Sequence, residues 1–176
     1  MLDFSHNYFQ LFGIEPAFRM DGEALERRYR ELQGQVHPDR FAHMPETEKR
    51  LSMQWATRVN EAFRTLKKPL PRAIYLLELA GIDVAHQSNT AMSSAFLMEQ
   101  MEWREAVEEA ERGRDTDELE KLRHRLMAHG KDVQAEAECA LDDTHDHVAA
   151  ADAVRRLMFI EKLRHDIEDA LENLES

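Results

Sequence analysis

The tripeptide His37-Pro38-Asp39 holds the side chains of this sequence that are best suited to chemistry. A histidine and an aspartate two positions apart can work as an acid–base pair, but that work needs a third group and a concave site. The sequence shows no serine or cysteine nucleophile in a recognisable context, no glycine-rich phosphate loop and no metal-spaced cluster. A plain turn is the competing interpretation, because Pro38 fixes the backbone and Asp39 can begin the next segment. Taken alone, the tripeptide favours the turn over an enzyme site.

Two amphipathic runs flank the tripeptide and are predicted to form an antiparallel pair of helices. The first helix begins after a capping Asp21 and stops at Pro38, which disfavours helical geometry at the preceding residue. Its apolar stripe has spacings of four, three and four residues: Leu25, Tyr29, Leu32 and Val36. The second helix is expected over about 46–68, with a buried face made of Leu51, Trp55, Val59, Ala62, Phe63 and Leu66. The tripeptide therefore lies at the turn between the two helices.

The rest of the sequence also predicts helices, so the fold class is all-α. Short helices over 7–12 and about 72–81 complete a first domain that is predicted to span 1–80. The polar segment 81–92 carries no hydrophobic period and is predicted to be a linker. Three long helices with short turns follow, and they predict a three-helix bundle over 93–176. Polar residues that can cap the first two of these helices precede them: Ser93 or Ser94, and Asp115.

The composition limits the class of protein and its compartment. Gly (6) and Pro (5) are few among 176 residues, and 43% of the residues are hydrophobic, which favours a helical protein with a core. The single cysteine, Cys139, excludes an internal disulfide and a cysteine-based zinc site, and we expect it to be half-buried. No apolar run reaches the roughly 18 residues that cross a bilayer, and no signal-peptide pattern is present. We therefore expect a cytoplasmic protein without a membrane partner.

Charge is divided unevenly between the two halves. Residues 1–80 carry 12 Lys and Arg against 11 Asp and Glu, a net charge of +1, whereas residues 81–176 carry a net charge of −13. This asymmetry indicates two regions with different partners, and the acidic half should repel nucleic acid. Histidines of the acidic half lack the i, i+4 spacing of a metal-binding pair and are expected to be solvated: His124, His129, His145, His147 and His165. Neither a metal nor a cofactor is expected.

The first 80 residues resemble the J domain of the DnaJ co-chaperone family. The matching motifs are the short helix YFQLFGI, the basic helix around Tyr29, the loop HPDRF and the stretch NEAFRTL. The resemblance implies that the domain binds a DnaK-class chaperone and stimulates ATP hydrolysis by that partner, so this chain is not expected to be an enzyme. His37, Pro38 and Asp39 would form the essential loop. Further contacts would come from Tyr29, Arg30 and Arg40, with Arg27 and Arg28 extending the positive face.

Two alternatives to these contact roles stay open. The arginines of the first helix could form an ordinary solvated helix surface, which is the usual role of exposed charges. Tyr29 lies on the apolar stripe, so its ring could belong mostly to the core.

The acidic half extends the resemblance to the HscB family, the bacterial J-type co-chaperones of iron–sulfur cluster assembly. The motifs that carry it are AFLMEQ followed by Glu-x-Arg-Glu, and AAADAVRRLMFIEKLR near the end. The resemblance implies an L-shaped arrangement of J domain and bundle, an HscA-type chaperone as the ATPase partner, and the scaffold protein IscU as the cargo of the bundle. The scaffold-binding positions would be Leu97, Met98, Met101, Glu102, Glu105 and Phe159.

Helical geometry gives most of these positions a common face. Residues 98, 101, 102 and 105 follow the spacing i, i+3, i+4, i+7, which produces an apolar patch edged by carboxylates. A patch of this kind favours protein binding, and methionine suits adaptable surfaces. The competing interpretation places the apolar members in the core of the bundle. A competing function is a J-domain co-chaperone that delivers other unfolded clients.

Overall fold

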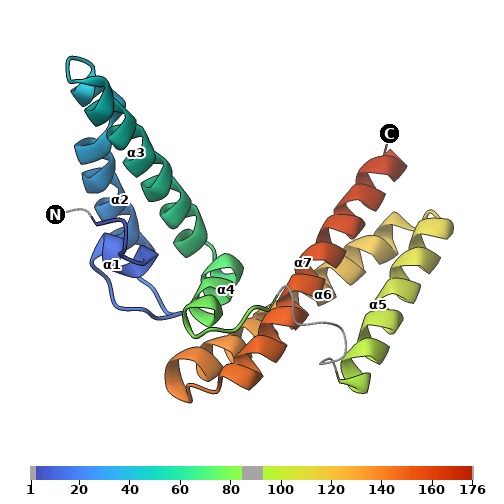
Figure 1. Ribbon diagram of the computed structural model, residues 1–176. Helices are drawn as coiled ribbons and strands as arrows, with labels where there is room; N and C mark the ends of the chain where they lie inside the picture. The colour runs from blue at the N-terminus through green and yellow to red at the C-terminus, as the bar shows by residue number, and fades with distance from the viewer. Residues whose placement is uncertain (1–2, 85–92, 176) are drawn as a thin grey trace. The chain divides into compact units, whose positions relative to one another are not determined.

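The computed structural model describes residues 3–84 and 93–175, which contain helices and no strand (Figure 1). The predicted all-α class is therefore confirmed. The chain divides into two compact units, Met1–Leu76 and Leu77–Ser176. The predicted linker 81–92 stays a prediction, because 85–92 lie outside the described residues. In chain order the elements are α1 (Tyr8–Phe12), α2 (Gly22–Val36), the 3₁₀ turn η1 (Pro38–Phe41), α3 (Glu46–Lys67), α4 (Pro69–Leu79), α5 (Ser94–Arg112), α6 (Thr116–Glu138), the π-helical turn η3 (Cys139–Asp143) and α7 (His147–Glu175).

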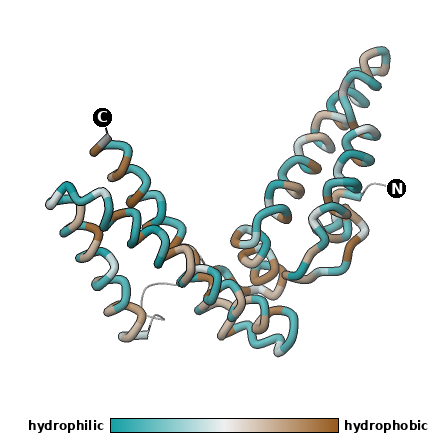
Figure 2. The backbone as a smooth tube through the Cα atoms, turned by 180° about the vertical axis from the view of Figure 1, so that it is seen from behind, coloured by the Kyte–Doolittle hydropathy of each residue, from teal (hydrophilic) through white to brown (hydrophobic). Residues whose placement is uncertain are grey.

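The first unit is built around the pair α2 and α3, which pack against each other with η1 at the turn (Figure 1). The predicted cap of α2 is confirmed, since one carboxylate oxygen of Asp21 accepts hydrogen bonds from the backbone N–H groups of Glu23 and Ala24. Both helices alternate between hydrophobic and hydrophilic segments, as amphipathic helices do (Figure 2). The helices α1 to α3 share one core: Phe9, Leu11, Phe12, Leu25, Val36, Trp55, Val59, Ala62 and Leu66.

The buried face of α3 differs from the predicted stripe in its first turns. The predicted core position of Leu51 is wrong, because its side chain is 46% exposed, and the neighbouring Ser52 is buried instead. Ser52 Oγ donates a hydrogen bond of 2.8 Å to the carbonyl oxygen of Val36. The last carbonyls of a helix have no partner within it, so a buried hydroxyl that satisfies one of them has a role that leucine could not fill.

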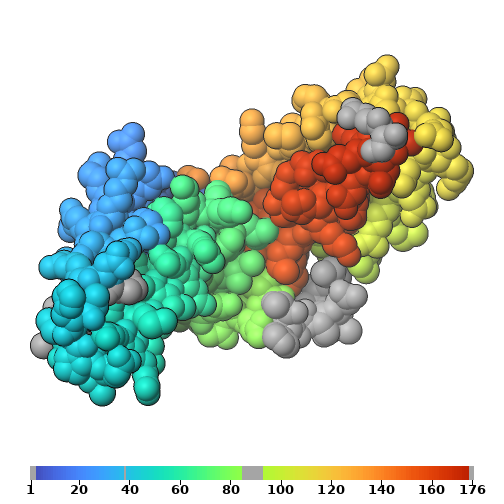
Figure 3. Space-filling view, turned by 90° about the horizontal axis from the view of Figure 1, so that it is seen from above, coloured from blue at the N-terminus to red at the C-terminus, as the bar shows by residue number. Residues whose placement is uncertain are grey.

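The second unit contains three long helices, α5, α6 and α7, with α6 and α7 in the most extensive contact. Figure 3 shows in space-filling form that α7 (red) lies against the neighbouring helices of its unit (yellow to orange). The cap of α5 is Ser93, whose hydroxyl accepts from the Phe96 N–H, and the cap of α6 is Asp115. The fully buried core of this unit is aliphatic: Leu119, Leu122, Leu126, Val133, Val154 and Ile167.

The turn η3 connects α6 to α7 and carries the single cysteine. Cys139 is exposed, so its predicted half-buried position is wrong. Ala137, Ala140 and Leu141 are the buried residues of this stretch. Because these three residues occupy the inward side of the backbone, Cys139 is left on the solvent side.

Candidate functional site

Two hydrogen bonds restrain the conformation of the His37-Pro38-Asp39 loop. The Asp39 N–H donates to His37 Nδ1 over 3.3 Å, and Arg40 donates from its guanidinium to the Gly34 carbonyl over 2.7 Å. The same Nδ1 lies 3.6 Å from Asp39 Oδ2, so both loop contacts of His37 use Nδ1, and Nε2 is the ring nitrogen left for a partner. The loop thus offers an imidazole edge and a carboxylate on a turn that Arg40 ties back to α2.

The exposure of the loop favours the docking interpretation over the enzymatic one. The side chains of His37 and Asp39 are 54% and 89% exposed. An acid–base site normally relies on burial and a water-excluding pocket to tune its groups, and these side chains lack that setting. Within the described residues, no group of three or more His, Cys, Asp or Glu side chains is arranged to hold a metal ion. The geometry is suited to contact with another protein.

The predicted positive face of α2 is exposed and only weakly neutralised. Arg28 lies 3.4 Å from Glu31 and Arg30 lies 3.6 Å from Glu26, and both pairs are solvent-exposed. Exposed ion pairs of this kind contribute about 0–1 kcal/mol, so the guanidinium groups can exchange them for a partner's carboxylates. Arg27 is exposed as well and forms no ion pair with the described part of the chain. Whether these arginines contact a chaperone stays a prediction.

Tyr29 links α2 to α3. Its ring stacks on Phe63 with 4.0 Å between ring centroids, and its hydroxyl donates to Asn60 Oδ1 over 2.9 Å. The same hydroxyl accepts from Gln33 over 2.8 Å. The ring is half-buried and packs against the core, as the alternative interpretation of this residue expected. Tyr29 therefore fixes the two helices relative to each other beneath the arginine face.

The predicted scaffold-binding stripe lies on the exposed side of α5. Leu97, Met98 and Met101 are 41%, 63% and 61% exposed, so none of them belongs to the core. Phe96 is the residue of this segment that is buried. The carboxylate-bearing members of the stripe, Glu102 and Glu105, are exposed too.

Phe159 lies on α7 and meets α5 across the helix interface. Its half-buried ring makes an edge contact with Phe96, with 6.0 Å between centroids. The Arg104 guanidinium lies 5.6 Å from the centre of the same ring. The structure thus brings Phe159 to the helix that carries the exposed stripe, next to Arg104, the arginine of the Glu-x-Arg-Glu motif.

His129 connects α5 to α6 and is not simply solvated as expected. Its Nε2 lies 2.6 Å from Glu99 Oε1, and both side chains are half-buried. The imidazole also stacks on Trp103, and Arg125 lies 5.3 Å from the centre of the indole. No spacing within one helix could show this cluster, because its members come from two helices. It fixes the turn of α5 on which the exposed stripe stands.

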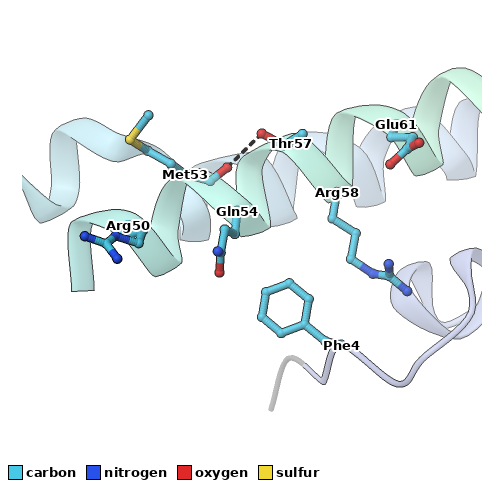
Figure 4. A pocket seen from close by; sticks show the side chains of 7 residues that line it. All are labelled: Phe4, Arg50, Met53, Gln54, Thr57, Arg58 and Glu61. Carbon is cyan, nitrogen blue, oxygen red and sulfur yellow. Dashed lines mark hydrogen bonds between the residues drawn. The ribbon is translucent and has the colours of Figure 1, made fainter. Parts of the chain in front are cut away.

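A hollow lies between α3 and the N-terminal segment of the first unit. Its volume is about 450 Å³. Figure 4 shows the side chains that line it: Phe4, Arg50, Met53, Gln54, Thr57, Arg58 and Glu61. Phe4 stacks on Trp55 with 3.8 Å between centroids, and Arg58 donates to the His6 carbonyl over 2.7 Å. These contacts tie the N-terminal segment to α3, which the sequence did not predict.

No helix of the described residues has the length and apolar character needed to cross a membrane.

Comparisons with known proteins find similarity along nearly the whole chain. The family model described as the HSCB C-terminal oligomerisation domain matches residues 92–168. A co-chaperone protein HscB homolog from Aromatoleum aromaticum is 63% identical over 175 residues, which are 99% of each chain. The structure of chaperone HscB from Vibrio cholerae is 38% identical, with a TM-score of 0.83 over 96% of this chain and 99% of that one. The crystal structure of human co-chaperone HscB is 31% identical, with a TM-score of 0.88 over 95% of this chain and 83% of that one.

Proposed function

The chain belongs to the HscB family of co-chaperones, and on that premise we propose that it stimulates the ATPase of an HscA-type chaperone and delivers the iron–sulfur scaffold IscU to it. The observation that carries the proposal is that each of the two units has its own exposed surface and that the two surfaces differ in chemistry. The first is the His37–Asp39 loop, which has an internal hydrogen bond and lies beside the arginines of α2. The second is the apolar stripe on α5, which is edged by carboxylates. The proposed domains are 1–80 for the chaperone and 93–176 for the scaffold.

At the chaperone end, this chain supplies contacts and the partner supplies the chemistry. The arginines of α2 attract an acidic surface, because complementary charge speeds encounter and sets orientation. The loop then adds directional contacts through the His37 imidazole and the Asp39 carboxylate, which a solvated arginine face alone lacks. The hydrolysed bond lies in the nucleotide of the chaperone, so the protein alone should hydrolyse no ATP.

At the scaffold end, the apolar stripe of α5 gives affinity and its carboxylates give selectivity. Leu97, Met98 and Met101 are available for burial, and a few central apolar anchors usually dominate an interface. Glu102 and Glu105 border the stripe and favour a partner with basic residues at matching positions. Phe159 is the proposed contribution of α7 to scaffold binding, and its half-buried ring packs against Phe96 of α5.

Replacement of His37 by Gln tests the chaperone end. We expect His37→Gln to lose most of the stimulation of the chaperone ATPase while it keeps scaffold binding, because the change removes an exposed imidazole and alters no core contact. His43→Gln is the matched control, since His43 is another exposed histidine just beyond η1. Full stimulation by His37→Gln would remove the loop from the mechanism.

The competing cargo, general unfolded clients, is favoured by one observation, the exposure of two methionines on α5, because methionine side chains can adapt to different partners. A direct binding comparison separates the two functions. We expect the scaffold to bind the full-length protein and an unfolded model protein to bind weakly or not at all. Equal binding of both would support the general function.

A further inference from the structure

A cavity of about 400 Å³ lies at the C-terminal end of α3, away from the loop. Its lining residues are Phe63, Arg64, Thr65, Lys67, Lys68 and Pro71. Three of these six residues are cations and none is acidic, while Phe63 and Pro71 provide an apolar wall. The cavity therefore suits a group that combines negative charge with some apolar surface.

The cations around this cavity are only partly neutralised. Lys67 Nζ lies 3.1 Å from Glu26 Oε1 and 5.2 Å from the centre of the Phe63 ring. Glu26 also lies 3.6 Å from Arg30, so a single carboxylate is shared by two cations. Arg64 and Lys68 form no ion pair with the described part of the chain. A net positive charge is left at the site.

The cavity continues the arginine face of α2 onto α3. Glu26 joins the two, because its carboxylate contacts Arg30 on α2 and Lys67 on α3. Phe63, which forms the cavity wall, is also the ring on which Tyr29 stacks. The proposed chaperone-binding face and the cavity are thus one surface.

We propose that this cavity receives an acidic segment of the same ATPase chaperone and acts as a second anchor for it; the inference rests on the proposed function. The loop lies at one end of the α2–α3 pair and the cavity at the other. A helix of the length of α2 spans about 22 Å. A contact at the tip alone leaves the partner free to pivot, whereas two contacts separated by about that distance fix its direction. An acidic protein segment fits better than nucleic acid, because the net charge of residues 1–80 is only +1.

Charge reversal at the two unpaired cations tests the proposal. The double variant Arg64→Glu/Lys68→Glu changes exposed residues that hold no ion pair, so the fold should be kept, and thermal unfolding verifies this. Stimulation of the chaperone ATPase is then titrated with the full-length protein. We expect the concentration for half-maximal stimulation to rise roughly tenfold, with a weaker dependence on salt and an unchanged maximum.

The control is Lys131→Glu, which reverses one exposed lysine on α6 and should leave the half-maximal concentration within about twofold of the wild type. An unchanged half-maximal concentration in the double variant overturns the proposal, and so does a fall in the maximum without such a change. His37→Gln is assayed alongside to separate two failures. If His37→Gln loses stimulation and the double variant does not weaken, only the second anchor is wrong. If His37→Gln keeps full stimulation, the proposed function fails.

Discussion

The double substitution Met98→Ala/Met101→Ala gives a sharp test of the exposed stripe on α5. Complete burial of a methionine side chain stabilises by about 1.5–3 kcal/mol. Because the two residues are already 37–39% covered and alanine keeps the β-carbon, each replacement should remove about 1–1.5 kcal/mol of scaffold binding. Together they should weaken the dissociation constant roughly 30- to 150-fold.

The same double variant should fold as well as the wild type. Exposed substitutions usually change the free energy of unfolding by less than about 0.5 kcal/mol, and alanine favours helices. Isothermal titration with the scaffold gives the dissociation constant, and thermal unfolding gives the stability. Met127→Ala is the control, since Met127 is a similarly exposed methionine on α6. A dissociation constant within about twofold of the wild type would show that the stripe is not the binding surface.

Three further predictions concern the first unit. Ser52→Ala should lower the free energy of unfolding by about 1–2 kcal/mol, because it leaves the buried Val36 carbonyl without its donor; denaturant unfolding checks this, and an equal loss in the exposed Thr57→Ala would contradict it. Asp21→Ala should cost about 1 kcal/mol through loss of the α2 cap, measured in the same way, and an unchanged midpoint would show the cap to be dispensable. Burial raises the pKa of the Tyr8 phenol above its usual 10.0, so the folded state favours the neutral phenol more than the unfolded state does. Stability should therefore decline as pH rises above about 10, and less steeply in Tyr8→Phe; identical alkaline profiles would exclude this contribution.

The sequence predicted the features that depend on local chemistry. Asp21, Ser93 and Asp115 are short polar residues before amphipathic runs, and each caps the expected helix in the structure. The positions of the stripe on α5 came from the resemblance, and the helical period gave residues 98, 101, 102 and 105 a common face; that the apolar members are exposed and not in the core is a finding of the structure. The all-helical class followed from many such runs and few Gly or Pro residues.

The features that sequence could not supply depend on which faces meet. In α3 both Leu51 and Ser52 fit the helical period, and the choice between them is made by a carbonyl at the end of another helix. The ion pair of His129 with Glu99 joins residues 30 positions apart, so no spacing within a helix indicates it. The cation-lined cavity at Phe63 likewise needs the end of α3, the start of α4 and a glutamate of α2 in one place.

The hydrogen bonds that restrain the His37–Asp39 loop affect the rate and the affinity with which a partner can bind it. A flexible loop must be ordered when it binds, and the conformational entropy lost in that step is subtracted from the affinity. Here the Asp39 N–H and the Arg40 guanidinium already restrain the backbone before any partner arrives. The loop is therefore pre-organised: a partner that binds it would lose little affinity to the ordering of the backbone, and no folding of the loop would have to precede binding.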